Sequence, residues 1–219
     1  HAPSVGESLM AQAIIQELRE KGETEPRRHE EASILFTDFS GFTQAVSTVP
    51  PRRLVQELNE IFRGFDDIVA EHGLEKIKTI GDAYMVVGGV PTPRLDHTEA
   101  VVEMALAMLE ACRRLSRGTP MPFTMRIGIN AGPVVAGVIG IKKFIYDLWG
   151  DTVNLASRME SHGVTGEIQV TDAVYQRMRQ KYLFEARGNV DIKGRGQQKT
   201  YLLKGRIDVL EAAIGEIRK

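Results

Sequence analysis

Two stretches of the sequence decide how the chain should fold: Phe36-Thr37-Asp38-Phe39-Ser40-Gly41-Phe42-Thr43 and Lys78-Thr79-Ile80-Gly81-Asp82. In each stretch an aspartate ends an apolar run that is typical of a strand, and a glycine lies nearby. Two such carboxylates at the ends of adjacent strands could hold divalent metal ions, since Mg²⁺ is usually bound by one or two carboxylates together with substrate phosphates. A pair of metals can stabilise both the attacking and the leaving oxygen of a phosphoryl transfer. The pattern favours nucleotide chemistry, although each aspartate alone would also fit a strand end or a turn.

The residues around the two aspartates strengthen this interpretation. Gly41, Phe42 and Thr43 follow Asp38 closely, and the glycine permits a tight turn whose backbone N–H groups point at an anion, with Thr43 suited to a helix start. Lys78 lies four residues before Asp82, so on an extended strand both side chains face the same side. A surface lysine is the simpler explanation of Lys78 alone. Together these residues predict a phosphate-binding cleft.

Two further segments carry polar groups in suggestive positions. In Tyr146–Arg158, Asn154 and Arg158 are four residues apart on an expected helix and therefore share a face, while the apolar residues between them indicate a half-buried helix. Asp191-Ile192-Lys193-Gly194-Arg195-Gly196 is a basic loop that could approach phosphates through Lys193, although alone it resembles an ordinary hairpin turn. Cys112 lies on the apolar stripe of an expected helix and is predicted to be a core residue.

The apolar periodicity predicts an alternation of strands and helices. Helices are expected over residues 7–20, 51–72, 96–115, 152–161 and 172–180, and strands over 33–38, 74–80, 84–87, 125–130, 134–139, 167–171, 182–186 and 200–203, with a turn at 131–133. This order is β-α-β-β-α-β followed by an α/β extension. It predicts an α+β fold with a ferredoxin-like core, in which helices cover a mostly antiparallel sheet.

Composition restricts the class of protein. The chain has 219 residues, 42% hydrophobic and 26% charged, with a net charge of −1, which gives no electrostatic case for binding nucleic acid. One cysteine cannot form an intramolecular disulfide, so we expect a reducing, cytoplasmic setting. No apolar run approaches the roughly 20 residues of a membrane span. Membrane attachment of a longer parent protein is left open.

We expect three parts in the chain. Residues 1–30 are expected to form an amphipathic helix and a polar linker, 31–205 a catalytic domain, and 206–219 a tail. Because the first residue is His1 and not Met, we expect a fragment of a longer protein, with the helix as the end of a signal-transmission segment and an upstream regulatory domain missing.

The quoted motifs, taken together, resemble the class III nucleotidyl cyclase catalytic domain, the family of adenylyl and guanylyl cyclases. The resemblance runs from about Ala32 to Leu203 and rests on four motifs in family order: residues 35–43, 75–82, 126–132 and 146–158. It implies the following roles. Asp38, Asp82 and the backbone carbonyl of Phe39 would bind two Mg²⁺ or Mn²⁺ ions, Lys78 and Asp147 would read the base, Asn154 would orient the ribose, Arg158 would meet charge on the α-phosphate, and Lys193 would hold the terminal phosphates.

The expected base readers favour adenine. A lysine ammonium donates and a carboxylate accepts, which complements the N1 acceptor and the exocyclic amine donor of adenine. Guanine carries an N1–H donor that would face the ammonium of Lys78, and buried mismatches of this kind are heavily penalised. Guanylyl cyclases of the family typically carry Glu and Cys at the positions of Lys78 and Asp147. We therefore predict conversion of ATP to 3′,5′-cyclic AMP and pyrophosphate. The alternatives are a guanylyl cyclase and a non-catalytic nucleotide-binding dimerisation module.

Family members place the active site at a dimer interface. The resemblance implies that one subunit supplies Asp38, Asp82, Lys78 and Asp147, and that the other supplies Asn154, Arg158 and Lys193. Because this chain carries both sets, we expect a two-fold homodimer with two equivalent composite sites.

Overall fold

The computed structural model describes residues 9–40, 46–80, 83–118, 124–139 and 145–217 of the chain. The first part of the described chain consists of α1 (Leu9–Lys21), β1 (Arg27–Ser40), α3 (Pro51–Glu71), β2 (Glu75–Ile80), β3 (Ala83–Gly88), α4 (His97–Gly118) and β4 (Thr124–Ile139). The second part consists of β5 (Ile145–Trp149), α5 (Asp151–Ser161), β6 (Ile168–Thr171), α6 (Asp172–Met178), β7 (Tyr182–Ile192), β8 (Gly196–Arg206) and α7 (Ile207–Ile217).

The strands form one eight-stranded sheet in the order β2-β3-β1-β4-β6-β8-β7, with β5 paired to β4 beside this path. The pairing of β4 with β6 is parallel, and the other pairings between described strands are antiparallel. The segment from β1 to β4 has the order β2-β3-β1-β4, which is the ferredoxin-like arrangement. The predicted mostly antiparallel α+β fold is therefore confirmed.

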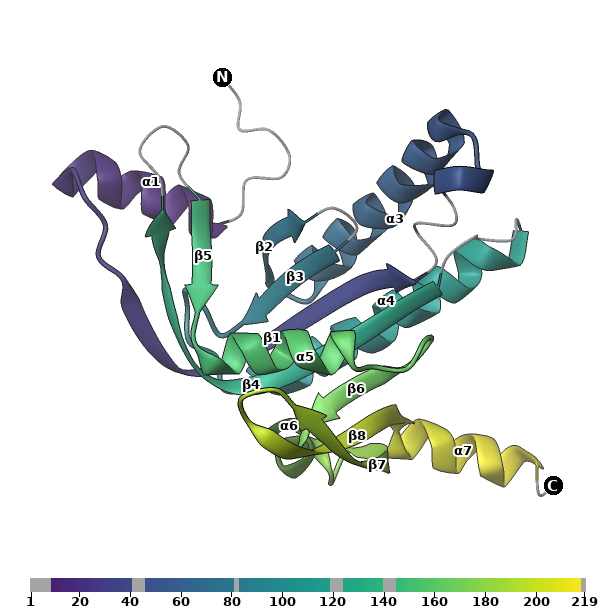
Figure 1. Cartoon of the computed structure of the whole chain (residues 1–219). Coiled ribbons are helices and arrows are strands. Elements are labelled where there is room, and N and C mark those ends of the chain that lie inside the picture. Colours follow the sequence, from purple (N-terminus) through teal and green to yellow (C-terminus); the bar gives the residue numbers. More distant parts are fainter. Residues whose placement is uncertain (1–8, 41–45, 81–82, 119–123, 140–144, 218–219) are drawn as a thin grey trace.

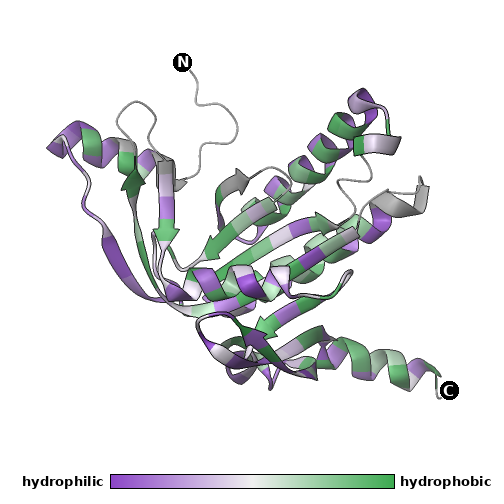
Figure 2. Cartoon of the chain, viewed as in Figure 1, coloured by the Kyte–Doolittle hydropathy of each residue, from purple (hydrophilic) through white to green (hydrophobic). Residues whose placement is uncertain are grey.

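Helices cover both faces of the sheet. Figure 1 shows α4 behind the strands and α5 in front of them, with the β7–β8 hairpin at the lower edge. The larger core cluster lies between the sheet and the helices α3 and α4. Its buried residues include Phe65 of α3, Met104 of α4 and Ile127 of β4. A second cluster on the opposite face includes Ile34 of β1, Val134 of β4 and Ala156 of α5. Figure 2 shows the hydrophobic residues gathered along the central strands, whereas the first residues of β1 are hydrophilic.

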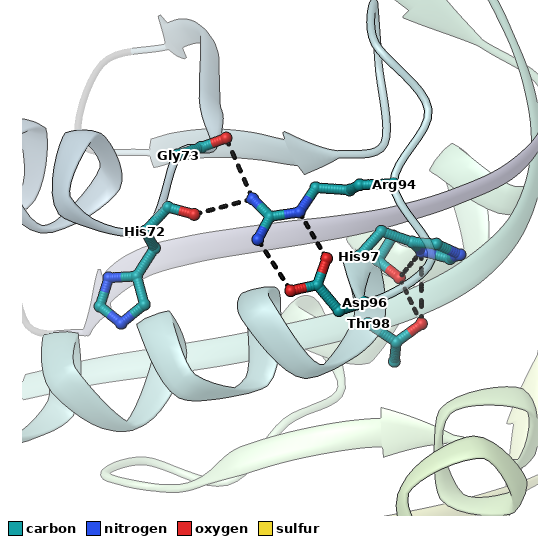
Figure 3. Close-up of polar contacts among 7 residues, drawn as sticks. His72, Gly73, Arg94, Asp96, His97 and Thr98 are labelled. Carbon is teal, nitrogen blue, oxygen red and sulfur yellow. Dashed lines mark hydrogen bonds and ion pairs between the residues drawn. The ribbon is translucent and has the colours of Figure 1, made fainter.

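The connection from β3 to α4 is held by one arginine (Figure 3). Arg94 donates to the carbonyl oxygens of His72 at 2.9 Å and Gly73 at 3.2 Å, which follow the end of α3. Its Nε and Nη2 donate to the carboxylate of Asp96 at 2.7 and 2.9 Å, and this contact lowers the pKa of that carboxyl. Arg94 thereby ties the end of α3 to the start of α4 at the edge away from the expected site.

Strand β4 differs from its prediction. The sequence predicts two strands separated by a turn at Ala131-Gly132-Pro133, but β4 runs without a break from Thr124 to Ile139. The register with β1 shifts between His29 and Ala32, and Pro133 lies at this irregularity, where no ladder N–H is needed. The prediction of a turn was wrong because Gly-Pro is typical of both a turn and a bulge.

Four other strands differ from their predictions. Strand β1 already begins at Arg27, inside the expected linker, because Arg27 and Arg28 pair with β4. Strand β5 was not predicted, and β7 and β8 are longer than expected. Helix α1 contacts the body through Ile14 and an ion pair between Glu17 and Arg27 at 3.3 Å. Among the helices that the structure describes, none is both long and apolar enough to cross a membrane.

Candidate active site

The end of β1 presents Asp38 on one face of the sheet and Phe39 on the other. The Phe39 ring is buried, 6.1 Å from the Phe62 ring and 6.4 Å from the Phe65 ring of α3. Since side chains alternate along a strand, Asp38 points to the opposite face, where it is half-buried and its Oδ1 accepts from the Phe39 N–H at 2.7 Å. Its partner across the strands is Arg126 of β4. The strand end thus combines a carboxylate with a backbone carbonyl fixed by an anchored aromatic ring.

Strands β2 and β3 bring the second expected stretch to the same end of the sheet. Tyr84, near the start of β3, pairs with Thr37, the residue before Asp38. Lys78 of β2 pairs with Met85, which in turn pairs with Phe36. The side chain of Lys78 lies outside what the structure describes, as do Asp82 and the expected phosphate turn of Gly41, Phe42 and Thr43.

Helix α5 carries Asn154 and Arg158 on its exposed side. The residues that it buries are Thr152, Val153, Leu155, Ala156, Met159 and Glu160, whereas Asn154 and Arg158 are exposed. The helix begins directly after Gly150, whose φ of 124° belongs to the region that favours glycine. The predicted half-buried helix with both polar residues on one face is therefore confirmed.

The sheet beneath α5 is shaped by two glycines of β4. A Cβ placed on Gly128 would lie 2.1 Å from the Glu160 nitrogen, and one on Gly132 would lie 2.8 Å from the Thr152 hydroxyl oxygen. In addition, the buried Asn130 amide donates to the Thr152 carbonyl at 3.1 Å and accepts from Thr171 at 2.7 Å. The helix backbone therefore lies directly on the strand, with no space for a side chain between them.

We predict that Gly128→Ala lowers the free energy of unfolding by about 3 kcal/mol, because the added methyl group would overlap the α5 backbone. Gly64→Ala is the control, since a Cβ on that α3 glycine meets nothing within 4 Å. It should raise the free energy of unfolding by up to ~1 kcal/mol through better helix propensity. Urea unfolding followed by circular dichroism measures both. Equal stability of the two variants would show that α5 can move away from β4 at little cost.

The β7–β8 turn brings Lys193 to α5. Ile192 at the end of β7 is buried in a small cluster with Leu155 and Met159 of α5. Arg195 in the same turn forms an ion pair with Asp151 in the first turn of α5. Lys193 lies between these two contacts and is exposed. Asn154 and Arg158 on α5, and Lys193 in the turn packed against it, are therefore all exposed.

Asp147 lies on β5 and is separated from Asp38 along β4. It pairs with Gly137 near the last residues of β4, whereas Asp38 pairs with Arg126 near the first residues of that strand. Figure 1 shows β5 at the left of the molecule and the end of β1 at the right. Strand β5 leads directly into α5 and contacts both α5 and β2. The expectation that one subunit joins Asp147 to Asp38 is wrong for a single chain, because β4 separates them along its length.

Several residues that support the site were not identified from the sequence. Asp151 and Arg195 lie in quoted motifs, yet their ion pair is visible only in the structure. Gln169 of β6 is fully buried and donates to the Met159 carbonyl of α5 at 3.1 Å. A single glutamine in an apolar strand carries no signal that distinguishes it from a surface residue. Arg187 of β7, which donates to the Gln169 side chain, is equally ordinary in sequence.

Burial raises the pKa of two groups, Tyr146 on β5 and Cys112 on α4. Tyr146, the neighbour of Asp147, has a pKa raised to about 12 by burial. Burial also raises the pKa of the Cys112 thiol to about 12. Cys112 packs against the larger core cluster, so its prediction as a core residue is confirmed.

The oxygen donors at the end of β1 fit a hard divalent cation. A carboxylate and a backbone carbonyl are ligands that Mg²⁺ and Mn²⁺ accept, whereas softer metals favour sulfur and imidazole. Within the described ranges no three His, Cys, Asp or Glu side chains come together, and Asp82 lies outside those ranges.

The comparisons with known proteins agree with this geometry. Residues 24–205 match the family described as the adenylate and guanylate cyclase catalytic domain, which uses divalent metal ions. The chain is 45% identical to an adenylate cyclase of Mycobacterium tuberculosis over 97% of its own length and 48% of the relative. It is 42% identical to human guanylyl cyclase C over 91% of its length and 19% of that protein. The chain therefore spans about half, or less, of the curated relatives that it matches.

Among solved structures, the chain resembles the catalytic core of a rhodopsin-guanylyl cyclase with converted specificity in complex with ATPαS. The TM-score is 0.79 and the identity is 37%, and the match covers 84% of this chain and all of that one. The family match covers most of the sequence, and the motif-bearing strands and helix lie within it. This chain belongs to the family of adenylate and guanylate cyclase catalytic domains.

Proposed function

We propose that this chain is an adenylyl cyclase domain that converts ATP to 3′,5′-cyclic AMP and pyrophosphate. The observation that carries the proposal is the exposed group on and around α5. Asn154 and Arg158 share one side of the helix, Asp147 lies on the strand that leads into it, and the Asp151–Arg195 ion pair holds the turn of Lys193 beside it. This group supplies one cation for the reacting phosphate, another for the terminal phosphates and a carboxylate for the base.

The choice of ATP rests on Lys78 and Asp147. Strand β2, which carries Lys78, contacts strand β5, which carries Asp147, and this contact supports our assignment of both residues to the same subunit. An ammonium donor and a carboxylate acceptor complement adenine. The N1–H of guanine is itself a donor, so it cannot hydrogen-bond to the ammonium. Known relatives include both adenylate and guanylyl cyclases, and so the pair of residues, more than the family, favours ATP.

Each residue has a role in the proposed reaction. Asp38, Asp82 and the Phe39 carbonyl would hold two Mg²⁺ or Mn²⁺ ions, which lower the pKa of the ribose 3′-hydroxyl and neutralise phosphate charge when bound. Asn154 orients the ribose for in-line attack on the α-phosphorus. Arg158 stabilises the charge that grows on the α-phosphate in the transition state, and Lys193 stabilises the departing pyrophosphate.

We further propose that two copies of the chain build each site. One subunit supplies the metal-binding set of Asp38, Phe39 and Asp82. The partner supplies the α5 set, which contains Asn154, Arg158, Lys193 and Asp147, with Lys78 grouped beside Asp147. This division differs from the one expected at first, since β4 keeps Asp147 away from Asp38 within one chain. A two-fold dimer would then hold two equivalent sites.

The products formed from ATP and from GTP test the proposal. The purified chain is incubated with each nucleotide in Mg²⁺ and in Mn²⁺, and the products are separated by chromatography. We expect cyclic AMP from ATP, no cyclic GMP from GTP, and loss of cyclic AMP formation in Asp38→Ala and Asp82→Ala. Cyclic GMP as the main product would overturn the argument from Lys78 and Asp147. Nucleotide binding without any product, in both metals, would favour a binding module.

A further inference from the structure

The last turn of α5 is held by side chains from three different strands. The final carbonyl groups of a helix have no partner within the helix and need donors from elsewhere. Here Gln169 of β6 donates to the Met159 carbonyl at 3.1 Å, Arg126 of β4 donates to the Ser161 carbonyl at 3.4 Å, and Arg187 of β7 donates to the His162 carbonyl. We call Arg126, Gln169 and Arg187 the α5 clamp.

The connection between Gln169 and Arg187 is the most sensitive part of the α5 clamp. The Gln169 side chain is fully buried, and its carbonyl oxygen accepts from Arg187 while its amide donates to Met159. Arg187 comes from the surface of β7 and is exposed. Removal of the arginine side chain would leave a buried amide oxygen without this donor, which is costly. The exposed arginine thus determines how the buried glutamine holds the helix.

Arg126 reinforces the same turn. Its Nε lies 3.3 Å from a carboxylate oxygen of Glu160, whose side chain is 11% exposed. Two guanidinium groups therefore lie at the end of α5 where the helix dipole is negative, an arrangement that favours the helical conformation up to its last residue. Arg126 is also the cross-strand partner of Asp38, so α5 is fastened next to the strand end that carries the metal-binding set.

Arg158 lies immediately before the residues that are clamped. Its carbonyl accepts from the His162 N–H at 2.9 Å and from the Ser161 hydroxyl at 3.4 Å, so the clamped turn starts at Arg158 itself. At the other end of the helix the Asp151–Arg195 pair fixes the first turn. The direction in which the Arg158 side chain leaves the helix therefore depends on the geometry of the last turn.

We propose that Arg187, acting through Gln169, is a positioning residue for Arg158. This inference rests on the proposed function, since it assigns the α5 clamp a part in the cyclase reaction. Misplacement of a catalytic group by about 1 Å can cost on the order of 10²-fold in rate. Because Arg158 acts on charge that develops in the transition state, its misplacement lowers kcat more than it raises KM for ATP.

The first test is kinetic. Arg187→Met is expected to lower kcat by between about 10-fold and 100-fold with little change in KM. Arg187→Lys keeps a donor at the position and should restore most of the rate. Arg177→Met is the matched control, since Arg177 also donates to a helix carbonyl, that of Ala173, and pairs with Glu31, but on α6. Unchanged kcat in Arg187→Met, or an equal loss in Arg177→Met, would overturn the proposal.

Mixed dimers then show through which half of the site Arg187 acts. Arg187→Met subunits mixed with Asp38→Ala subunits should regain about a quarter of the wild-type rate, because half the dimers hold one site with an intact α5 from the Asp38→Ala subunit. A mixture of Arg187→Met and Arg158→Ala subunits should regain no activity, because every dimer then combines an intact metal-binding set with an impaired α5 set. Recovery with Arg158→Ala, or failure with both, would contradict the assignment. The reference mixture of Asp38→Ala and Arg158→Ala subunits must itself recover; its failure would count against the composite site and not against the α5 clamp.

Amide hydrogen exchange gives a result that needs no activity. The N–H groups of His162 and Gly163 bond to the carbonyls of Arg158 and Glu160, both at 2.9 Å, and close the last turn of α5. Arg187→Met should speed their exchange at least several-fold, while the α6 amides keep their rates. Unchanged exchange at His162 and Gly163 would overturn the proposal even if the protein proved to have another substrate.

Discussion

Arg158→Ala is expected to lower kcat by roughly 10³-fold or more while KM for ATP changes little. Arginines that stabilise the charge of a phosphoryl-transfer transition state contribute about 10³–10⁵ in rate. Arg158 lies exposed on α5, and the buried face of the helix holds it against β4, so its removal takes away charge without removing packing. Initial rates of cyclic AMP formation over a range of ATP concentrations separate kcat from KM.

The control for this variant is Arg179→Ala, an exposed arginine that follows α6. It should leave both constants near their wild-type values, since α6 lies away from the α5 set. If Arg158→Ala instead raised KM and kept kcat, Arg158 would bind ATP equally in the ground and transition states. The proposed role at the α-phosphate would then be wrong.

The joint exchange of Lys78→Glu and Asp147→Cys is expected to reverse the preference from ATP to GTP. A site built to hydrogen-bond one base rejects the mismatched one by about 10⁴-fold, because buried polar groups are left unpaired. Glutamate at position 78 would accept from the guanine N1–H, and loss of the carboxylate at 147 removes the acceptor for the adenine amine. The ratio of kcat/KM for ATP to that for GTP measures the change.

The single variants make this experiment discriminating. Lys78→Glu alone and Asp147→Cys alone should each lose activity with ATP and gain little with GTP, since one half of the pair still opposes guanine. If the double variant still preferred ATP, the base would be recognised by other groups. If Asp147→Cys alone sufficed, Lys78 would have no part in the choice.

Much of the fold could be predicted because apolar residues recur at helical or strand spacing in most of its elements. The apolar residues at helical spacing predicted α3 almost to the residue, and a proline at its start supplied the boundary. Strand β5 was missed because it has only five residues, too few to show a clear alternation of apolar and polar side chains. Among the described strands it pairs with β4 alone. The Gly-Pro pair in β4 predicted a turn, since a local pattern does not reveal whether a partner strand continues beside it.

The site was predictable as a set of residues but not as an arrangement. Spacing predicted correctly that Asn154 and Arg158 share one face of a helix, and the structure shows that this face is exposed. It could not indicate that β4 is a single strand of 16 residues, which keeps Asp147 apart from Asp38. The α5 clamp could not be predicted from the sequence either, because Gln169 and Arg187 come together only through the pairing of β6, β8 and β7. The division into residues 1–30, 31–205 and 206–219 stays a prediction.

The central pairing of β1 with β4 has a consequence for how the chain reaches its native state. Arg27 pairs with Ala136 and Ser40 with Thr124, so residues 41–123 separate the two strands at the middle of the sheet along the chain. Contacts between distant residues must overcome the entropy of closing a long loop, and topologies dominated by them fold slowly. During synthesis β1 cannot pair with β4 until β4 has left the ribosome, so its apolar side chains stay incompletely buried until then. The hydrophilic start of β1, from Arg27 to Glu31, gives the waiting strand a charged end that disfavours pairing with other chains.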